Sequence, residues 1–157
     1  MSMENRDGLI WFDGQWLPWR DAKVHVLTHT LHYGYGCFEG IRAYETAAGP
    51  ALFRLPEHLR RLEDSARILA IDMPFDRSTL TEACREVVAR NGLNSAYVRP
   101  LVFLGDEKLG VDPAGAKTHV MVTAWPWGTY LGGAALQTGI RVRVSSYARH
   151  HPNVQMC

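Results

Sequence analysis

Two amphipathic helical patterns lie between groups of strand-like segments, and this order constrains the fold more than any other feature. In the first pattern, Leu59, Leu62, Ala66 and Leu69 recur at spacings of three and four residues, which predicts one buried helix face. Pro56 stands just before them, where the first turn of a helix tolerates proline. The segment therefore predicts a helix that packs on a sheet.

A second helix is predicted from about Ser78 to Asn91. Asp76 or Ser78 is the expected N-cap, and Gly92 ends the helix. Its expected core face consists of Leu80, Ala83, Cys84, Val87 and Val88.

The strand-like segments lie on both sides of the two helices. Asp13-Gly14 between short apolar runs predicts a hairpin of Leu9–Phe12 with Gln15–Leu17. A second pair is expected from Phe38–Thr46 and Ala51–Phe53, and three further strands from Ala96–Leu104, His119–Trp125 and Ile140–Tyr147. This order predicts an α+β fold in which two helices pack on one face of an antiparallel sheet.

Composition excludes several classes of protein. The 157 residues suffice for one core, and the net charge of +1 gives no general attraction for nucleic acid or a membrane surface. No signal peptide is apparent, no apolar run is long enough to span a membrane, and three cysteines suggest no disulfide framework. We expect a reduced, cytoplasmic protein. Arginine greatly outnumbers lysine, from genome composition or because some guanidinium groups bind phosphate or carboxylate.

Glycines and aromatic side chains alternate between Val26 and Thr46, in V-L-T-H-T-L-H-Y-G-Y-G-C-F-E-G-I-R-A-Y-E-T. Glycine lets the backbone approach a ligand closely, while Tyr33 and Phe38 offer rigid apolar walls. This combination predicts the lining of a small-molecule pocket.

Three other segments carry candidate binding residues. Arg61 lies on the flank of its predicted helix, either in solvent or positioned to bind an anionic cofactor group. Tyr97 and Arg99 alternate on one strand, so they share a face, as an exposed pair or as a carboxylate site. Trp127 and Tyr130, in the run W-P-W-G-T-Y, belong either to a core corner or to a pocket wall.

Metal and thiol chemistry are the weaker interpretations. His25, His29 and His32 have helical spacing, but no acidic ligand follows and the nearby glycines oppose a long helix. Cys37 could be paired with His32 as a nucleophile, yet no third orienting group is evident. We expect packed side chains and no metal site.

The quoted run resembles the N-terminal signature of branched-chain amino acid aminotransferases, pyridoxal-phosphate enzymes of fold type IV in class IV of the aminotransferases. The blocks I-W-F-D-G-Q-W, D-A-K-V-H-V, E-H-L-R-R-L, S-A-Y-V-R-P-L, W-P-W-G-T-Y-L-G and V-S-S-Y-A-R-H-H-P-N resemble successive family blocks in the same order. The resemblance covers essentially the whole chain.

The resemblance implies a role for each matching residue. Arg61 corresponds to the arginine that binds the cofactor phosphate, and Arg99, with Tyr97 nearby, to a residue that accepts the side-chain carboxylate of glutamate. Phe38, Trp127 and Tyr130 correspond to aromatic pocket walls. Tyr33 and Val111 correspond to positions that often reach the pocket of the opposite protomer, which implies a homodimer or larger homo-oligomer. The implied substrates are leucine, isoleucine, valine, glutamate and 2-oxoglutarate.

One family residue has no match here. The family's Schiff-base lysine follows the H-P-N-V block, so we expect it just beyond Cys157 and expect these 157 residues alone to be inactive. We expect residues 1–135 to form the small N-terminal domain and residues 136–157 the connection to a larger domain. Two alternatives stay open: another fold type IV enzyme, such as a D-amino acid or (R)-amine transaminase, and a module that binds or dimerises without catalysis.

Overall fold

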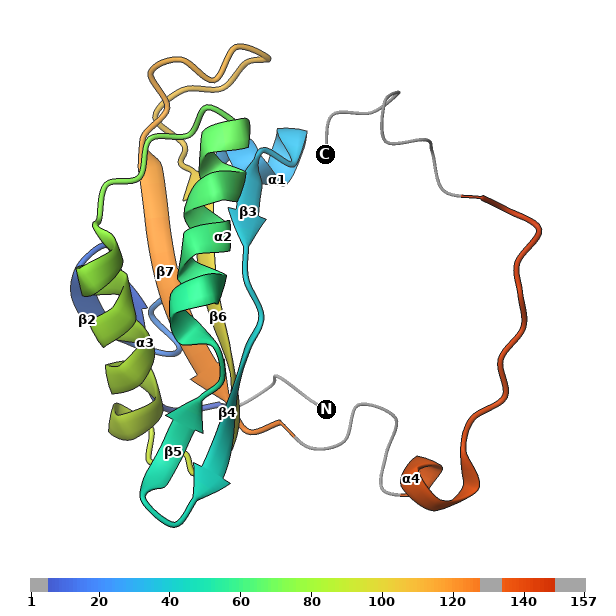
Figure 1. Ribbon diagram of the computed structural model, residues 1–157. Coiled ribbons are helices and arrows are strands. Elements are labelled where there is room, and N and C mark those ends of the chain that lie inside the picture. The colour runs from blue at the N-terminus through green and yellow to red at the C-terminus, as the bar shows by residue number, and fades with distance from the viewer. Residues whose placement is uncertain (1–5, 128–133, 149–157) are drawn as a thin grey trace. The chain divides into compact units, whose positions relative to one another are not determined.

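The computed structural model describes residues 6–127 and 134–148 (Figure 1). Within residues 6–127, every strand pairs antiparallel in one sheet, in the order β2-β1-β7-β6-β4-β5, with β3 also paired to β6. The strands are β1 (Leu9–Phe12), β2 (Gln15–Pro18), β3 (Gly36–Phe38), β4 (Ile41–Thr46), β5 (Gly49–Leu52), β6 (Ala96–Leu104) and β7 (Thr118–Trp125). The helices of this part are α1 (His29–Tyr33), α2 (Leu55–Ile68) and α3 (Arg77–Arg90). The sheet and helices confirm the predicted α+β class.

The predicted hairpin forms between β1 and β2. Asp13 and Gly14 both have positive φ, at 47° and 85°, as a tight two-residue hairpin turn requires. The Asp13 carboxylate then accepts a hydrogen bond from the backbone N–H of Val120 on β7, at 2.9 Å. The turn residue thus also attaches the hairpin to the centre of the sheet.

Strands β3 and β4 both pair with the same edge of β6, in one continuous register. Phe38 lies opposite Leu101 and Ile41 lies opposite Val98, so Glu39 faces Pro100. The Glu39 N–H donates to the Pro100 carbonyl at 3.0 Å, but proline has no N–H to return the bond. The ladder is therefore interrupted at Glu39, although the expected strand from Phe38 to Thr46 continues on both sides.

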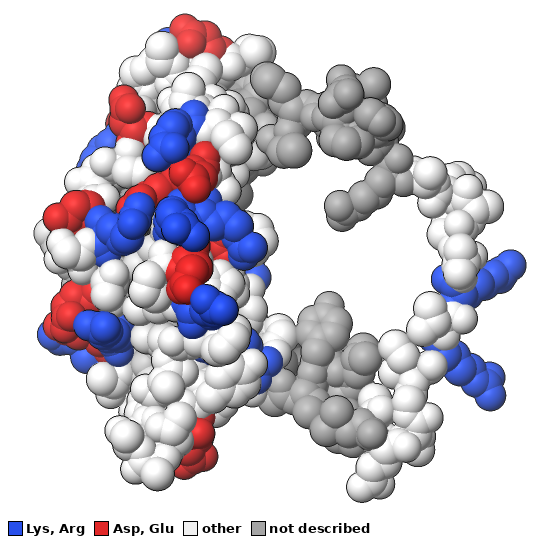
Figure 2. Space-filling model, in the orientation of Figure 1, with Lys and Arg blue, Asp and Glu red and all other residues white. Residues whose placement is uncertain are grey.

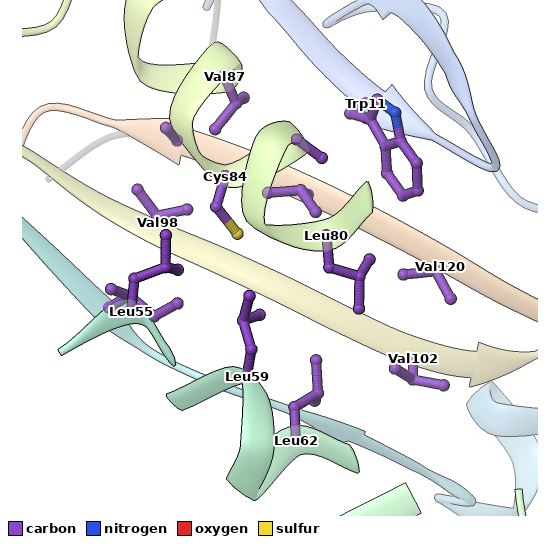
Figure 3. Packing of buried hydrophobic residues seen from close by; sticks show 14 of the residues in the cluster. Trp11, Leu55, Leu59, Leu62, Leu80, Cys84, Val87, Val98, Val102 and Val120 are labelled. Atoms are coloured by element: carbon purple, nitrogen blue, oxygen red, sulfur yellow. The ribbon is translucent and has the colours of Figure 1, made fainter. Parts of the chain in front are cut away.

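Helices α2 and α3 both cover the same face of the sheet (Figure 1). Leu55, Leu59 and Leu62 of α2 point toward the apolar side chains of the sheet, as do Leu80, Cys84 and Val87 of α3 (Figure 3). The predicted core face of α3 is buried in full. In α2, Leu69 is only partly buried and follows the helix end.

The N-cap of α3 is Asp76, whose carboxylate accepts a hydrogen bond from the Thr79 N–H at 2.8 Å. This contact decides between the two expected cap residues. It satisfies one of the backbone donors that a helix start leaves unpaired.

The expected strand Ile140–Tyr147 is wrong. Residues 134–148 contain a short helix, α4 (Ala135–Thr138), followed by chain without strand pairing. The alternating Ile140, Val142 and Val144 are all exposed. Alternation predicts a strand only where a neighbouring strand accepts the backbone hydrogen bonds, and no described residue supplies one. The boundary predicted at residue 135 stays a prediction.

Among the described residues, no helix is long and apolar enough to cross a membrane.

Candidate functional site

The sheet face that α2 and α3 leave uncovered carries a cluster of aromatic rings around one guanidinium group. The Arg99 guanidinium carbon lies 4.4 Å from the ring centre of Phe38, 5.2 Å from Tyr97 and 5.7 Å from Trp125. Arg99 Nη2 also donates to the Tyr97 hydroxyl at 3.1 Å. The structure places Tyr97 and Arg99 on one face of β6, as the sequence predicted, and brings Phe38 of β3 against them.

Two indole rings hold Tyr97 in this cluster. Trp125 and Trp127 each place a ring centre 4.9 Å from that of Tyr97. Trp125 is buried, whereas Trp127 is half-buried, so the first forms an inner wall of the cluster and the second lies at its rim. Tyr130, the other wall residue predicted in this segment, lies outside the described residues.

Gly40 and Arg42 also belong to this face; both lie in the run predicted to line a pocket, but neither was assigned a role of its own. A Cβ at Gly40 would lie 2.8 Å from Cζ of Tyr97, so only glycine leaves room for that ring. Arg42 lies directly opposite Tyr97 in the ladder, which puts both side chains on the same face. Its Nε is buried without a hydrogen-bond partner. The sequence alone does not show that Arg42 pairs with Tyr97 across the two strands, and this pairing is what places Arg42 at the site.

A pocket of about 450 Å³ extends from this cluster over the open sheet face. Its walls are mainly apolar and include Leu101, Phe103, Met121 and Trp125. Two polar atoms along it, Nε of Arg99 and Oγ1 of Thr123, are buried without a protein partner. Buried polar atoms normally have a partner, so these two are available to a bound polar group.

Arg61 lies on the helix-covered side, where Glu39 binds it. Its Nε and Nη2 donate to the two oxygens of the Glu39 carboxylate at 2.5 and 2.7 Å. His58 Nδ1 contacts Oε2 of the same carboxylate at 2.8 Å. Burial acts to raise the pKa of Glu39, but the hydrogen bonds and charges of Arg61 and His58 outweigh it and lower that pKa below its usual value of 4.5.

The Arg61 side chain is 67% exposed despite this ion pair. The helix face around it carries basic and acidic side chains in close alternation (Figure 2). Arg61 thus lies on a solvent-exposed helix flank, as one interpretation of the sequence had it, while binding of an anionic cofactor group stays a prediction.

Tyr33 and Val111 do not join the aromatic cluster; His29 connects the Tyr33 ring to the backbone of Gly110, the residue before Val111. The buried ring of His29 packs 4.6 Å from the ring centre of Tyr33, and its Nε2 contacts the Gly110 carbonyl at 2.8 Å. Val111, next to Gly110, is 86% exposed. Two side chains predicted to reach an opposite protomer are thus presented from one corner of the chain.

The histidines and cysteines have structural contacts. His29 and His32 each contact a different backbone carbonyl, of Gly110 and Val26. Burial, with a smaller effect from the Glu39 charge, raises the pKa of Cys37 to about 11. Burial raises the pKa of Cys84 to about 12. Neither thiol is activated as a nucleophile.

Comparisons with known proteins agree with this geometry. The family model described as amino-transferase class IV matches residues 36–157. A branched-chain-amino-acid aminotransferase of Pseudomonas aeruginosa is 55% identical over 156 residues, which are 99% of this chain and 51% of that protein. The crystal structure of the Escherichia coli branched-chain amino acid aminotransferase superposes with a TM-score of 0.91 at 49% identity, over 96% of this chain and 50% of that one.

A second solved structure is a T.th. branched-chain amino acid aminotransferase complexed with N-(5'-phosphopyridoxyl)-L-glutamate. It superposes with a TM-score of 0.87 at 48% identity, over 96% of this chain and 48% of that one. This chain therefore spans about half the length of the relatives that it matches. Since the family model covers most of the sequence, the chain belongs to the class IV aminotransferase family.

Proposed function

We propose that this chain is the small domain of a branched-chain amino acid aminotransferase. The complete enzyme would move the amino group of leucine, isoleucine or valine to 2-oxoglutarate with pyridoxal phosphate as cofactor. The observation that carries this proposal is the Arg99 guanidinium among aromatic rings, beside a mainly apolar pocket. The names of the similar proteins support the same activity.

The site has two kinds of surface, and the two substrates need both. Phe38 and the indole rings offer apolar contact for a branched side chain. The Arg99 guanidinium and the Tyr97 hydroxyl offer donors for the second carboxylate of glutamate or 2-oxoglutarate. One pocket could then alternate between an apolar and an acidic side chain without rearranging its backbone.

The cofactor fits the residues of this chain only in part. Arg61 keeps an exposed guanidinium edge for the phosphate, and the open face would hold the substrate side chain. When bound, pyridoxal phosphate supplies the electron sink that makes the α-proton of an amino acid removable. Because this chain spans about half the length of its relatives, the proposal places the lysine that anchors the cofactor and moves that proton outside these 157 residues, as the family resemblance implies.

The proposal includes a cytoplasmic homo-oligomer. In it, Tyr33 and Val111 of each protomer would line the pocket of its partner. Their exposure at one corner of the chain supports this arrangement.

The test uses the full-length protein that contains this sequence. We expect deamination of L-leucine that depends on 2-oxoglutarate, and little reaction with D-alanine. Arg99→Ala should impair glutamate and 2-oxoglutarate more than leucine, since only the acidic substrates need the guanidinium. Preference for D-alanine would identify another fold type IV enzyme. A reading frame that stops at Cys157 would instead favour a non-catalytic module.

A further inference from the structure

Glu39 occupies an unusual position for a carboxylate, because the residue is only 5% exposed at a break in the sheet edge. Burial of an unpaired carboxylate is costly, and Glu39 avoids that cost through Arg61 and His58. Its backbone is also fixed, since its N–H donates to the Pro100 carbonyl. The carboxylate therefore has a defined place relative to the sheet.

We propose that Glu39, itself held by His58, is a positioning residue that aims the Arg61 guanidinium at the phosphate of the cofactor; this inference rests on the proposed function. A guanidinium group is planar and carries five N–H donors. Glu39 engages Nε and Nη2, which fixes the plane of the group. The Nη1 edge then faces away from Glu39 on an exposed side chain. Arg61 thus needs no reorganisation to receive an anion.

The neighbours of Glu39 in the sequence connect the Glu39–Arg61 ion pair to the open face of the sheet. Side chains alternate across a strand, so Phe38 and Gly40 face the open side while Glu39 faces α2. Phe38 packs on Arg99, and Gly40 leaves space for Tyr97. Three consecutive residues therefore serve the substrate cluster on one face and Arg61 on the other.

The sign of the effect separates positioning from simple electrostatics. Glu39 carries a negative charge close to the group that would bind phosphate, so Coulomb's law alone predicts tighter phosphate binding when that charge is removed. Positioning predicts the opposite, because an unsupported arginine loses its fixed orientation. Glu39→Gln keeps the size of the side chain while removing the charge.

The experiment measures dissociation constants for pyridoxal 5'-phosphate and for pyridoxal, which lacks the phosphate, in the full-length protein by tryptophan fluorescence. We expect Glu39→Gln to weaken binding of pyridoxal 5'-phosphate about tenfold, the lower range for loss of an outer-shell partner at metal sites. Pyridoxal affinity should change by less than about twofold, the usual error of additivity. In an Arg61→Ala background, Glu39→Gln should have no further effect on the phosphate form.

Glu63→Gln is the matched control, because Glu63 lies on α2, as Arg61 does, and accepts a hydrogen bond from another arginine, Arg77, at 3.0 Å. It should alter neither constant. Glu39→Asp keeps the charge on a shorter side chain and replaces Glu39→Gln if the latter does not fold; it should weaken only the phosphate form.

Equal losses for both vitamin forms, tighter phosphate binding, or an unchanged loss without Arg61 would each overturn the inference. Failure of the proposed function looks different, because the wild-type protein would then not deaminate L-leucine with 2-oxoglutarate, whatever its affinity for the two vitamin forms.

Discussion

Replacing Gly40 with alanine should disturb the open sheet face, because the added methyl group meets the Tyr97 side chain. The added Cβ would lie 2.8 Å from Tyr97 Cζ and 3.1 Å from Cε2, whereas ordinary contacts begin at 3.4 Å. Because the Tyr97 hydroxyl oxygen lies nearer to the added Cβ than Cζ does, the side chain must withdraw by more than about 0.6 Å, the difference between 3.4 and 2.8 Å. Trp125 and Trp127 restrict that movement, since both rings lie against Tyr97.

The expected cost follows from this crowding. Forcing an extra methyl group into a packed site costs about 1–3 kcal/mol. With a urea dependence of about 2 kcal/mol per molar, the midpoint of unfolding should fall by about 1 M. The hydrogen bond from Arg99 to the Tyr97 hydroxyl should also lengthen, because the hydroxyl moves with its ring.

Urea unfolding followed by tryptophan fluorescence measures the effect, since Trp125 and Trp127 report on the Tyr97 ring directly. The same substitution in a Tyr97→Ala background isolates the contact, because the obstructing ring is then absent. We expect Gly40→Ala to be nearly neutral there. An equal loss of stability in both backgrounds would refute the steric explanation.

Three further predictions concern stability. His29→Ala should expose the 105–117 loop to proteolysis at Gly110, because the buried ring and its contact with the Gly110 carbonyl are lost. The stability advantage of the wild-type protein over Glu39→Gln should be full above pH 4.5 and should shrink as the pH falls, because the folded pKa of Glu39 is lowered from that value; urea unfolding across pH 3–6 measures it. Leu59→Ala should cost about 2–5 kcal/mol, while the neighbouring Arg60→Ala should change the free energy of unfolding by about 0.5 kcal/mol or less.

Each of these predictions has a contradicting result. Unchanged proteolysis of the His29 variant would mean that other contacts hold the loop. A stability difference that does not vary with pH would show that the Glu39 carboxylate gains nothing from its partners. Equal costs at Leu59 and Arg60 would contradict the assigned helix face.

Local patterns predicted the elements well where local physics decides them. Strand β6 was predicted from Ala96 to Leu104, the same bounds as observed, because its alternation is long and regular. The Asp13-Gly14 turn is set by two residues with positive φ. Ile140–Tyr147 shows the limit, since alternation without a pairing partner did not produce a strand.

The site was predictable only where its residues share an element. Tyr97 and Arg99 lie two positions apart on one strand, so their common face follows from the period of the strand. Glu39 and Arg61 are 22 residues apart, and their contact depends on how α2 crosses the sheet edge. The spacing of leucines predicts which face of α2 is buried, but it contains no information on that crossing.

The interruption at Pro100 has a practical consequence for directed evolution of substrate choice. Under the proposed function, Phe38 and Gly40 are natural positions to randomise for a larger or smaller amino acid, yet both flank the carboxylate that binds Arg61. Any variant that shifts the hydrogen bond from the Glu39 N–H to the Pro100 carbonyl would also disturb Glu39 and Arg61 on the helix-covered face. Libraries at these positions should therefore be selected with excess vitamin in the medium. Variants with a useful substrate choice are then not lost because they bind the cofactor weakly.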